Sequence, residues 1–471
     1  MELDTGPVSG PELAEAGQRL AEEWADSGLR PGDRVGLWLP NGRRYLDALA
    51  ACASGAYVAV SVNTRWTDAE ARTLLSRTGA RWLRTADADE PLKPEGDPGP
   101  LAKLRDGDRP FVIFTTSGTT SQPKMVLHGQ RSIVVHAHDA ARGFGYKLSG
   151  GAGREPGPVL VAMPLCGVFG LTSFTAAVAG QATIIMPSTI DPVDIAHRVE
   201  RQRVWAMNGS DDLFHRMLAA DGETVDLASL EICGYGRFNT SLDGIVERAE
   251  QRGMVLTGLY GMSEVQALYS VRDVTGDPVE RQKAGGTVVS PDAEARVVDD
   301  ELQLRGPSLF AGYLAEGGAS IDETLTATSF TDDGWFRTGD AAEMEPPSDG
   351  RSTFIYRARM GDVLRLGGFL VAPSEIESVL IGLPGIRAAQ VVSVDRPTGA
   401  RPVAFITGPG SDETFDEQAA IAHCATHLAK FKRPIRVIPI DRFPTTPSAN
   451  GTKIQKVKLR EMAAAAVADT P

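Results

Sequence analysis

The sequence is poor in cysteine and lacks the marks of secreted and membrane proteins. Its 4 cysteines are far apart and form no Cys-x-x-Cys pair, which argues against a disulfide framework or a cysteine-based zinc site and favours a reduced, cytoplasmic compartment. Met1 to Gly10 is acidic without an apolar core, so we expect no secretory signal. The longest apolar run, Tyr45 to Val62, is interrupted by Asp47 and Gly55. It predicts a helix and a strand rather than a membrane span.

Positive charge is also scarce. The chain has 48 basic and 61 acidic residues, a net charge of −13, and no long basic run. This balance argues against nucleic acid or an anionic membrane as the main partner. His423 and His427 would share one helix face, but no Cys or carboxylate ligands lie nearby in the sequence, so we expect a solvated helix rather than a metal site. At 471 residues the chain is too long for one core, and a soluble enzyme with two or more structural units fits best.

Strand-like runs alternate with helix-like stretches through the first three quarters of the chain. The predicted strands are Arg34 to Leu39, Ala56 to Val62, Val159 to Met163, Ala182 to Met186, Val204 to Met207, Leu230 to Cys233 and Met254 to Leu259, with helices at Asp191 to Gln202 and Ser241 to Gln251. This order is typical of parallel α/β layers, in which ligands bind at the carboxyl ends of strands. Ala295 to Leu304 instead predicts a hairpin.

The pattern changes again after Asp362. The expected elements are a helix at Pro373 to Gly382, strands near Ala388 to Val394 and Val403 to Thr407, a helix at Asp416 to Lys430 and a strand near Ile435 to Ile440. These elements predict a small, separate α+β unit.

The segment most informative about function is a loop rich in Ser and Thr. A strand-like run, Phe111 to Phe114, ends in small residues around Gly118, and Lys124 follows. Hydroxyls and backbone N–H groups of such a loop can wrap a polyphosphate, glycine permits close approach and the lysine adds charge. The nucleotide-hydrolase P-loop needs glycine directly before Lys-Ser or Lys-Thr, whereas Pro123 precedes the lysine here. Taken alone, the segment could also be an ordinary surface turn. His128, at its end, is expected to fix the loop rather than transfer protons.

Further motifs follow this loop. They are Leu259-Tyr-Gly-Met-Ser-Glu264, Gly334-Trp-Phe-Arg-Thr-Gly-Asp340, Arg359-Met-Gly-Asp-Val-Leu-Arg-Leu-Gly-Gly368, Val371-Ala-Pro-Ser-Glu-Ile-Glu377 and Asn450-Gly-Thr-Lys-Ile-Gln-Lys456. In this order and at these separations, the set resembles the ANL superfamily of adenylate-forming enzymes. The superfamily includes acyl- and aryl-CoA synthetases, the adenylation domains of peptide synthetases, and beetle luciferases. Each motif is weak alone, but together they cover nearly the whole chain.

The resemblance implies an α/β fold with a large multi-layer AMP-binding domain, residues 1–361, and a small mobile α+β domain, residues 362–471. Asp362 would be the hinge on which the smaller domain rotates between half-reactions, carrying Lys453 into and out of the site. The family's usual chain starts earlier than this one. Residues that often contribute to the substrate side and to dimer contacts are therefore expected to have no counterpart before Glu12, and a homodimer stays open.

Formation of an acyl adenylate brings a carboxylate against the α-phosphate of ATP, so cations and N–H donors must do most of the work. By resemblance, Lys453 bridges these two groups, Glu264 holds Mg²⁺, and Ser263 keeps a hydroxyl where the family usually has threonine. Asp340 and Arg359 resemble the pair that reads the ribose. The expected ATP site comprises Thr116, Ser117, Gly118, Thr119, Thr120, Lys124, Gly234, Tyr235, Gly236, Tyr260, Gly261, Ser263, Asp340, Arg359 and Lys453. Its two tyrosines flank the adenine by resemblance, or are ordinary core aromatics.

Departures from the family pattern bear on the substrate. The family usually places an aromatic residue or histidine where Gly167 stands, and its loss opens space in the carboxylate pocket. Asp211 and Asp212 add charge beside the expected substrate wall, which suggests either an amine-bearing substrate or helix N-capping. Arg237 could pair an anionic group. The expected substrate side comprises Gly167, Val168, Phe169, Asn208, Asp211, Asp212 and Arg237.

The leading hypothesis is a ligase that activates a small carboxylic acid, with an aryl acid as the expected class, using ATP and transfers it to CoA. The segments Leu366 to Val371 and Ile454 to Lys456 resemble the CoA synthetase branch most. An alternative is a diazotase that adenylates nitrite and diazotises an aromatic amine, and a third is a stand-alone adenylation enzyme for a carrier protein. A nucleotide-binding scaffold without catalysis is disfavoured, since the expected catalytic residues are present.

Overall fold

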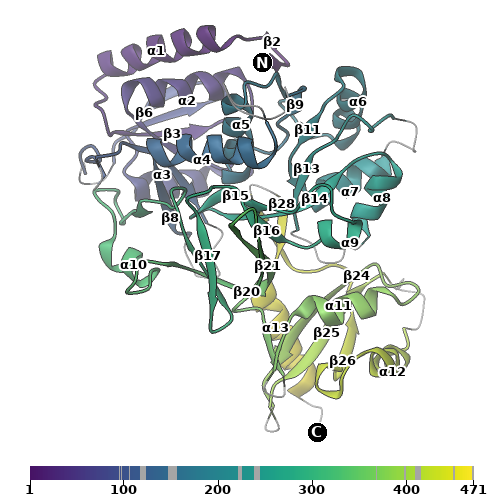
Figure 1. Cartoon of the computed structure of the whole chain (residues 1–471). Coiled ribbons are helices and arrows are strands. Elements are labelled where there is room, and N and C mark those ends of the chain that lie inside the picture. The colour runs from purple at the N-terminus through teal and green to yellow at the C-terminus, as the bar shows by residue number, and fades with distance from the viewer. Residues whose placement is uncertain are drawn as a thin grey trace.

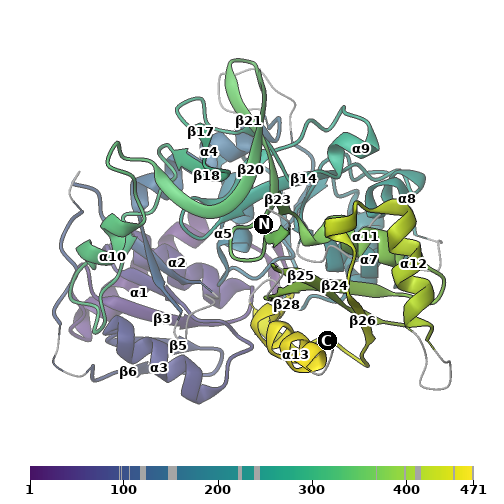
Figure 2. The same cartoon turned by 90° about the horizontal axis from the view of Figure 1, so that it is seen from below.

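The computed structural model describes residues 1–94, 96, 98–104, 107–116, 123–146, 156–220, 225–237, 244–366, 369–396, 399–408, 415–448 and 451–468. Within these residues, three sheets and their covering helices form the larger part of the molecule, and a smaller α/β unit lies beside it (Figures 1 and 2). This mixed α/β architecture, with a large amino-terminal and a small carboxyl-terminal part, confirms the predicted fold class. No helix of the described residues is long and apolar enough to cross a membrane.

The first large sheet leads into the Ser- and Thr-rich loop at residues 115–124, called the phosphate loop after its predicted role. Its order is β19 (Gly312–Tyr313), β8 (Met125–Gly129), β7 (Pro110–Thr115), β4 (Val58–Ser61), β3 (Arg34–Trp38), β5 (Trp82–Thr85) and β6 (Asp89–Pro91). Strands β7, β4, β3 and β5 run parallel, so their carboxyl ends share one edge. Helices α1 (Gly10–Asp26), α2 (Arg43–Gly55) and α3 (Asp68–Thr78) accompany this sheet, and α1 packs along α2 (Figure 1).

The second sheet is small. Its order is β11 (Ala206–Met207), β9 (Val159–Leu160), β10 (Ile184–Met186), β1 (Glu2–Leu3) and β2 (Gly6–Pro7). Helices α4 (Gln130–Gly143), α5 (Val168–Ala179) and α6 (Pro192–Gln202) lie among these elements in the sequence, and α4 packs against α5.

The third sheet departs from the predicted parallel pattern. Its order is β12 (Gly209–Ser210), β13 (Cys233–Gly236), β14 (Leu256–Met262), β15 (Gln266–Val271), β16 (Gly285–Val288), β21 (Arg351–Arg359), β20 (Phe336–Ser348), β18 (Glu301–Arg305) and β17 (Glu294–Val298). Only β12 to β14 pair in parallel. The other pairs are antiparallel, and three of them, β14 with β15, β17 with β18 and β20 with β21, are hairpins. Helices α7 (Asp211–Ala220), α8 (Ile245–Gln251), α9 (Pro278–Arg281) and α10 (Glu323–Thr328) complete this part.

Two boundaries differ from the sequence prediction in ways that affect the site. The strand expected at Leu230 to Cys233 lies at Cys233–Gly236, and β14 continues to Met262. The glycines that interrupt these strands caused the shift, because glycine ordinarily marks a strand end. The predicted hairpin is confirmed as β17 and β18, with Asp299 and Asp300 in the left-handed region at its turn (φ 51° and 66°).

The carboxyl-terminal unit is built around β24 (Ala388–Val394), β25 (Arg401–Thr407) and β26 (Arg436–Pro439). Successive side chains of β24 point to opposite faces of this sheet and belong to two hydrophobic cores. Val391 packs with α11 (Pro373–Ile381) and α12 (Glu417–His427) on one face. Val392 packs with α13 (Lys456–Ala468) on the other face. A short helix, Lys430–Lys432, follows α12. The remaining strands form two hairpins, β22 (Leu364–Leu366) with β23 (Phe369–Val371) and β27 (Thr445–Ser448) with β28 (Gly451–Ile454). In Figure 1, β28 extends from this unit toward the larger part.

Candidate active site

The neck of the phosphate loop is closed by one backbone hydrogen bond. The Thr116 N–H donates to the Lys124 carbonyl at 3.0 Å, at the carboxyl end of β7. Ser117, Gly118, Thr119 and Thr120 lie outside the described residues. The Lys124 ammonium lies 4.4 Å from the centre of the Tyr313 ring, which is within the range of a cation–π contact. The loop thus leaves the edge where parallel strands bind ligands.

Glu264 stands next to this loop and is held from two sides. The Tyr313 hydroxyl donates to Oε1 of Glu264 at 3.0 Å, and the Phe310 N–H donates to the Glu264 carbonyl at 2.8 Å. Burial, and then the nearby Glu264 charge, raises the pKa of Tyr313, so this hydroxyl stays protonated as a donor. Because β19 also pairs with β8, Glu264, Tyr313 and Lys124 form one connected group. Tyr313 was not expected from the sequence, since no local pattern reveals this long-range pairing.

Asp340 and Arg359, both expected at the ribose, lie side by side on paired strands, and their ribose-binding role stays a prediction. They are register partners on β20 and β21, and the Arg359 guanidinium lies 3.0 Å from Oδ1 of Asp340. Thr338 organises both residues: its hydroxyl accepts from the Asp340 N–H at 3.0 Å, and its carbonyl accepts from Arg359 at 3.2 Å. Burial raises the pKa of Asp340, while the Arg359 charge and a hydrogen bond from Tyr260 lower it. The result is a buried carboxylate with fixed orientation.

The two expected adenine-flanking tyrosines both lie in the core. The Tyr260 hydroxyl donates to Oδ2 of Asp340 at 2.6 Å, and its ring packs on Phe354 and Tyr356. The Tyr235 hydroxyl donates to the Gln282 carbonyl at 2.9 Å. Both hydroxyls therefore already have structural partners, and the base-flanking role stays a prediction.

Tight backbone packing surrounds the glycines of β13 and β14. A Cβ on Gly234 would lie 2.5 Å from Oδ1 of Asn208, and a Cβ on Gly261 would lie 2.6 Å from the Ala267 Cα. Oδ1 of Asn208 accepts from the Gly234 N–H at 3.1 Å. Gly236 pairs with Ser210 at the end of β13. Asn208, which is expected on the substrate side, therefore contacts β13, the strand expected to face the nucleotide.

The acidic pair at the start of α7 has two different environments. Asp211 is buried, and its Oδ1 accepts from the Asp212 N–H at 2.9 Å. Asp212 is exposed and lies 3.8 Å from Arg216, one turn along the helix. The hydroxyl of Ser210 accepts from the Leu213 N–H at 3.2 Å and caps α7, so both acids lie in the first turn of the helix, where negative charge is favourable. Arg237 is half-buried and ends the described stretch after β13.

Gly167 caps α5, and the next two residues are buried. Gly167 has extended backbone angles (φ −102°, ψ 148°) and gives no side-chain cap, while Val168 and Phe169 lie in the core. The segment before them is held by Asn41, whose amide donates to the Met163 carbonyl at 3.0 Å and accepts from the Leu165 N–H at 2.8 Å. Asn41 was not expected from the sequence, and only its position after β3 could have indicated it.

The residues expected to move lie at the junction of the two parts. Asp362 lies in the turn after β21, where Nη2 of Arg460 donates to Oδ1 of Asp362 and to the Gly361 carbonyl, both at 2.7 Å. On β28, Lys453 pairs with Thr446 of β27, and the side chain of Lys453 lies outside the described residues. Three residues on, Lys456 lies 3.2 Å from the buried carboxylate of Glu377. Helix α13 is thus tied to both α11 and the turn that contains Asp362.

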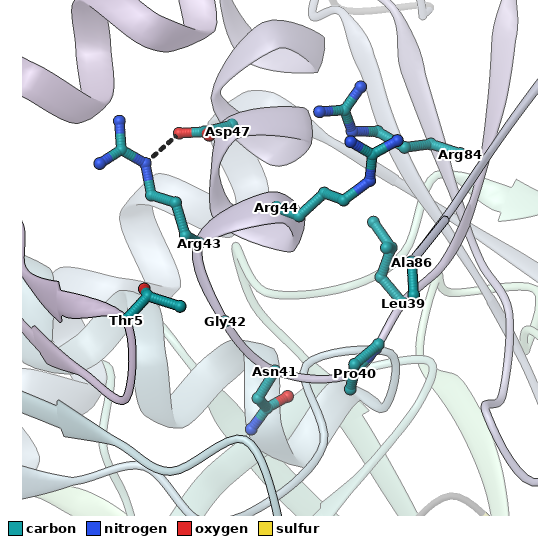
Figure 3. Close-up of a pocket in the computed structure, with 10 residues that line it drawn as sticks. All are labelled: Thr5, Leu39, Pro40, Asn41, Gly42, Arg43, Arg44, Asp47, Arg84 and Ala86. Atoms are coloured by element: carbon teal, nitrogen blue, oxygen red, sulfur yellow. Dashed lines mark hydrogen bonds and ion pairs between the residues drawn. The ribbon is translucent and has the colours of Figure 1, made fainter. Parts of the chain in front are cut away.

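A cavity of about 340 Å³ lies elsewhere, between the start of α2 and the end of β5 (Figure 3). Its lining residues are Thr5, Leu39, Pro40, Asn41, Gly42, Arg43, Arg44, Asp47, Arg84 and Ala86. Arg43 is paired with Asp47 at 2.7 Å, and Arg44 and Arg84 share Asp89. No predicted site residue lines this cavity, and its cations already have carboxylate partners.

Comparison with known proteins identifies the family. The model of the AMP-binding enzyme family matches residues 5–314, and that of the AMP-binding enzyme C-terminal domain matches residues 375–450. The chain belongs to the AMP-binding enzyme family. Its resemblance to the ANL adenylate-forming superfamily is thereby confirmed, and the chain is an adenylate-forming enzyme.

Relatives of this AMP-binding enzyme align along nearly the whole chain. A 7a-methyl-1,5-dioxo-octahydro-1H-inden-4-yl propanoyl:CoA ligase of Mycobacterium tuberculosis is 30% identical, over 96% of this chain and 93% of that protein. The 2-succinylbenzoate–CoA ligase of Listeria monocytogenes is 27% identical, over 96% and 93%. Among solved structures, the O-succinylbenzoate Coenzyme A Synthetase of Bacillus subtilis in complex with AMP has a TM-score of 0.78 and 22% identity, and covers 97% of this chain and 94% of that one. This last likeness supports the fold.

Proposed function

We propose that the protein is an ATP-dependent, AMP-forming ligase that activates a small carboxylic acid and transfers it to CoA. The buried carboxylate of Asp340, fixed by Tyr260 and Arg359, carries the proposal. A carboxylate in this position can accept from two vicinal hydroxyls, and charge-assisted bonds of this kind contribute on the order of 1.5–3 kcal/mol each. The relatives that align along the whole chain are named CoA ligases, which favours CoA as the acceptor.

The residues at Glu264 fit Mg²⁺ bound together with a nucleotide. Among the described residues, no group of three or more His, Cys, Asp and Glu side chains could hold a metal alone. Mg²⁺ commonly uses one or two carboxylates and completes its shell with water and substrate phosphates. Tyr313 holds Oε1 of Glu264, so the carboxylate is oriented before the ion arrives. When bound, Mg²⁺ would neutralise charge on the phosphates. The O-succinylbenzoate Coenzyme A Synthetase of Bacillus subtilis has been solved in complex with ATP and a magnesium ion, which supports this pairing.

The protein's own side chains would then divide the work. Lys124, the N–H groups of the phosphate loop and Lys453 would hold the anions that must approach one another. Asp340 and Arg359 would hold the ribose. Residues 1–361 would form the nucleotide-binding domain and residues 362–471 the mobile domain, with the Asp362 turn as the hinge, so that Lys453 acts in the first half-reaction and leaves before the second.

The substrate side favours a compact acid. Gly167 leaves space where the family usually places a larger side chain, and three other residues expected on the substrate side, Val168, Phe169 and Asn208, are buried. The names of the relatives include ring-bearing acids such as 2-succinylbenzoate, which favours an aryl or cyclic substrate. The nitrite-activating diazotase and the carrier-protein adenylating enzyme are outcomes that the following test separates.

The test is acid-dependent AMP formation by the purified protein. We expect AMP and pyrophosphate to form with ATP, Mg²⁺ and one or more acids from a panel of aromatic and cyclic acids, and a thioester to appear once CoA is added. Mass spectrometry identifies the product. AMP formation that depends on nitrite and consumes an aromatic amine, without any response to CoA, would overturn the CoA ligase assignment. If the adenylate transferred only to a carrier protein, the assignment of CoA as the acceptor would be overturned, but the activation of an acid by ATP would stand.

A further inference from the structure

The segment that carries Glu264 has an unusual backbone. Gln266 and Leu268 have left-handed angles, with φ of 66° and 60°, although both are buried and neither is glycine. The register between β14 and β15 also shifts just before Glu264, between Tyr260 and Met262. Non-glycine residues keep such conformations only where their surroundings enforce them. Contacts from another element must therefore hold this segment.

Two buried histidines supply contacts on both sides of Glu264. Nε2 of His128, at the end of β8, lies 2.7 Å from the Ser263 carbonyl, and Nε2 of His136, on α4, lies 2.6 Å from the Ala267 carbonyl. A carbonyl only accepts, so each imidazole carries its proton on Nε2. Burial lowers the pKa of both rings, that of His128 to about 4, and both are neutral near pH 7.

The environment of the other ring nitrogen indicates that the two histidines are present for their hydrogen bonds rather than for packing. Nδ1 of His128 and Nδ1 of His136 are buried without a hydrogen-bond partner. A buried acceptor without a partner costs stability, so an apolar side chain of similar size would be better for packing alone. The Gln266 amide adds further ties, donating to the carbonyls of Ser132 on α4 and Ser308 at 3.1 and 3.3 Å.

We infer that His128 and His136 are positioning residues that fix the Ser263–Ala267 segment, and so the carboxylate of Glu264, against the element that follows the phosphate loop. The inference rests on the proposed role of Glu264 in binding Mg²⁺. Because β8 begins directly after Lys124, the two donors keep the metal-binding carboxylate and the phosphate loop in one rigid body. Preorganised groups of this kind need no rearrangement when the charged ligand binds.

The test compares His128→Leu with His128→Gln, since the glutamine amide can donate from nearly the same position as Nε2. ATP affinity is measured by calorimetry over a range of Mg²⁺ concentrations. Loss of one oriented donor should raise the Mg²⁺ concentration for half-maximal ATP binding about tenfold in His128→Leu, whereas His128→Gln should stay close to wild type. Ile133→Ala, a core substitution on α4 with no polar contact, is the control for lost packing, and thermal melting checks that each variant folds.

The inference is overturned if folded His128→Leu keeps the wild-type Mg²⁺ dependence, or if His128→Gln and Ile133→Ala shift it as much as His128→Leu does. His136→Leu with His136→Gln repeats the comparison on the other side of Glu264, should either His128 variant fail to fold. ATP binding requires no acid. A wild type that binds ATP with Mg²⁺ but activates no acid therefore contradicts the proposed function and leaves this comparison decisive.

Discussion

The hydroxyl of Tyr260 donates a 2.6 Å hydrogen bond to the buried carboxylate of Asp340. Burial, and then the Asp340 charge, keeps the pKa of this hydroxyl well above its ordinary value, so it acts as a donor throughout the physiological range. The contact orients the carboxylate so that Oδ2 accepts from Tyr260 while Oδ1 faces Arg359. Tyr260 therefore affects the nucleotide through Asp340.

We expect Tyr260→Phe to weaken ATP binding about tenfold, because a hydrogen bond to a charged group is worth about 1.5–3 kcal/mol. ATP affinity is measured by calorimetry. Tyr356→Phe is the matched control, since its ring packs on Tyr260 with centroids 5.8 Å apart and the donor to Asp340 stays in place. Equal affinities in wild type and Tyr260→Phe would contradict the role given to Asp340.

Lys453→Ala is expected to suppress adenylate formation while ATP affinity changes little. The ammonium acts where the carboxylate meets the α-phosphate, so its contribution is made mainly in the transition state. The contacts of Asp340 and Arg359 lie on other strands and remain. Acid-dependent pyrophosphate release measures the first effect, and calorimetry the second. Pyrophosphate release at the wild-type rate would remove Lys453 from the mechanism.

The sequence predicted which residues belong together better than it predicted how they are held. Asp340 and Arg359 are far apart in the chain, yet their motifs predicted a pair, and β20 and β21 bring them into register. By contrast, no local pattern encodes the hydrogen bond from Tyr313 to Glu264 or the one from Arg359 to the Thr338 carbonyl. Each depends on which strands become neighbours, and that is decided by the packing of the whole domain.

The ends of strands were hardest to predict where close packing requires glycine inside a strand. In β13 the residues Gly234 and Gly236 suggested the end of a strand, although the strand runs through them. Glycine is needed at 234 because Oδ1 of Asn208 occupies the space that a side chain would fill. Close packing thus overrides the ordinary preference of glycine for turns.

Asp362→Pro should slow transfer to CoA more than adenylate formation, because fixing φ restricts a residue that would absorb the domain rotation. The substitution also removes the ion pair with Arg460 and the hydrogen bond from the Asp362 N–H to the Arg359 carbonyl. Arg460→Ala removes the ion pair and the hydrogen bond to the Gly361 carbonyl but leaves φ of residue 362 unrestricted, and it is the control. Single-turnover assays follow adenylate and thioester separately. If both half-reactions fell equally in Asp362→Pro, the hinge would lie elsewhere.

Stability in acid should depend on His128. Its pKa is lowered to about 4 in the folded protein, against an ordinary value of about 6.5. Between pH 6.5 and pH 4, His128 is therefore protonated in the unfolded chain but neutral in the folded protein. The free energy of unfolding falls as the pH falls through this window. The shift corresponds to about 3 kcal/mol at pH 4. Above pH 6.5 the effect is absent, since the ring is neutral in both states.

The measurement compares the unfolding of wild type and His128→Gln from pH 7 to pH 4. Carboxylates and the neighbouring His136, whose pKa burial also lowers, titrate in both proteins, so only the difference between the two curves reports on His128. We expect wild type to lose more stability than the variant as the pH falls, because glutamine takes up no proton and still offers an N–H to Ser263. Parallel curves would show that the ring is protonated as easily in the folded protein as in the unfolded chain, which its burial and its 2.7 Å contact with the Ser263 carbonyl argue against.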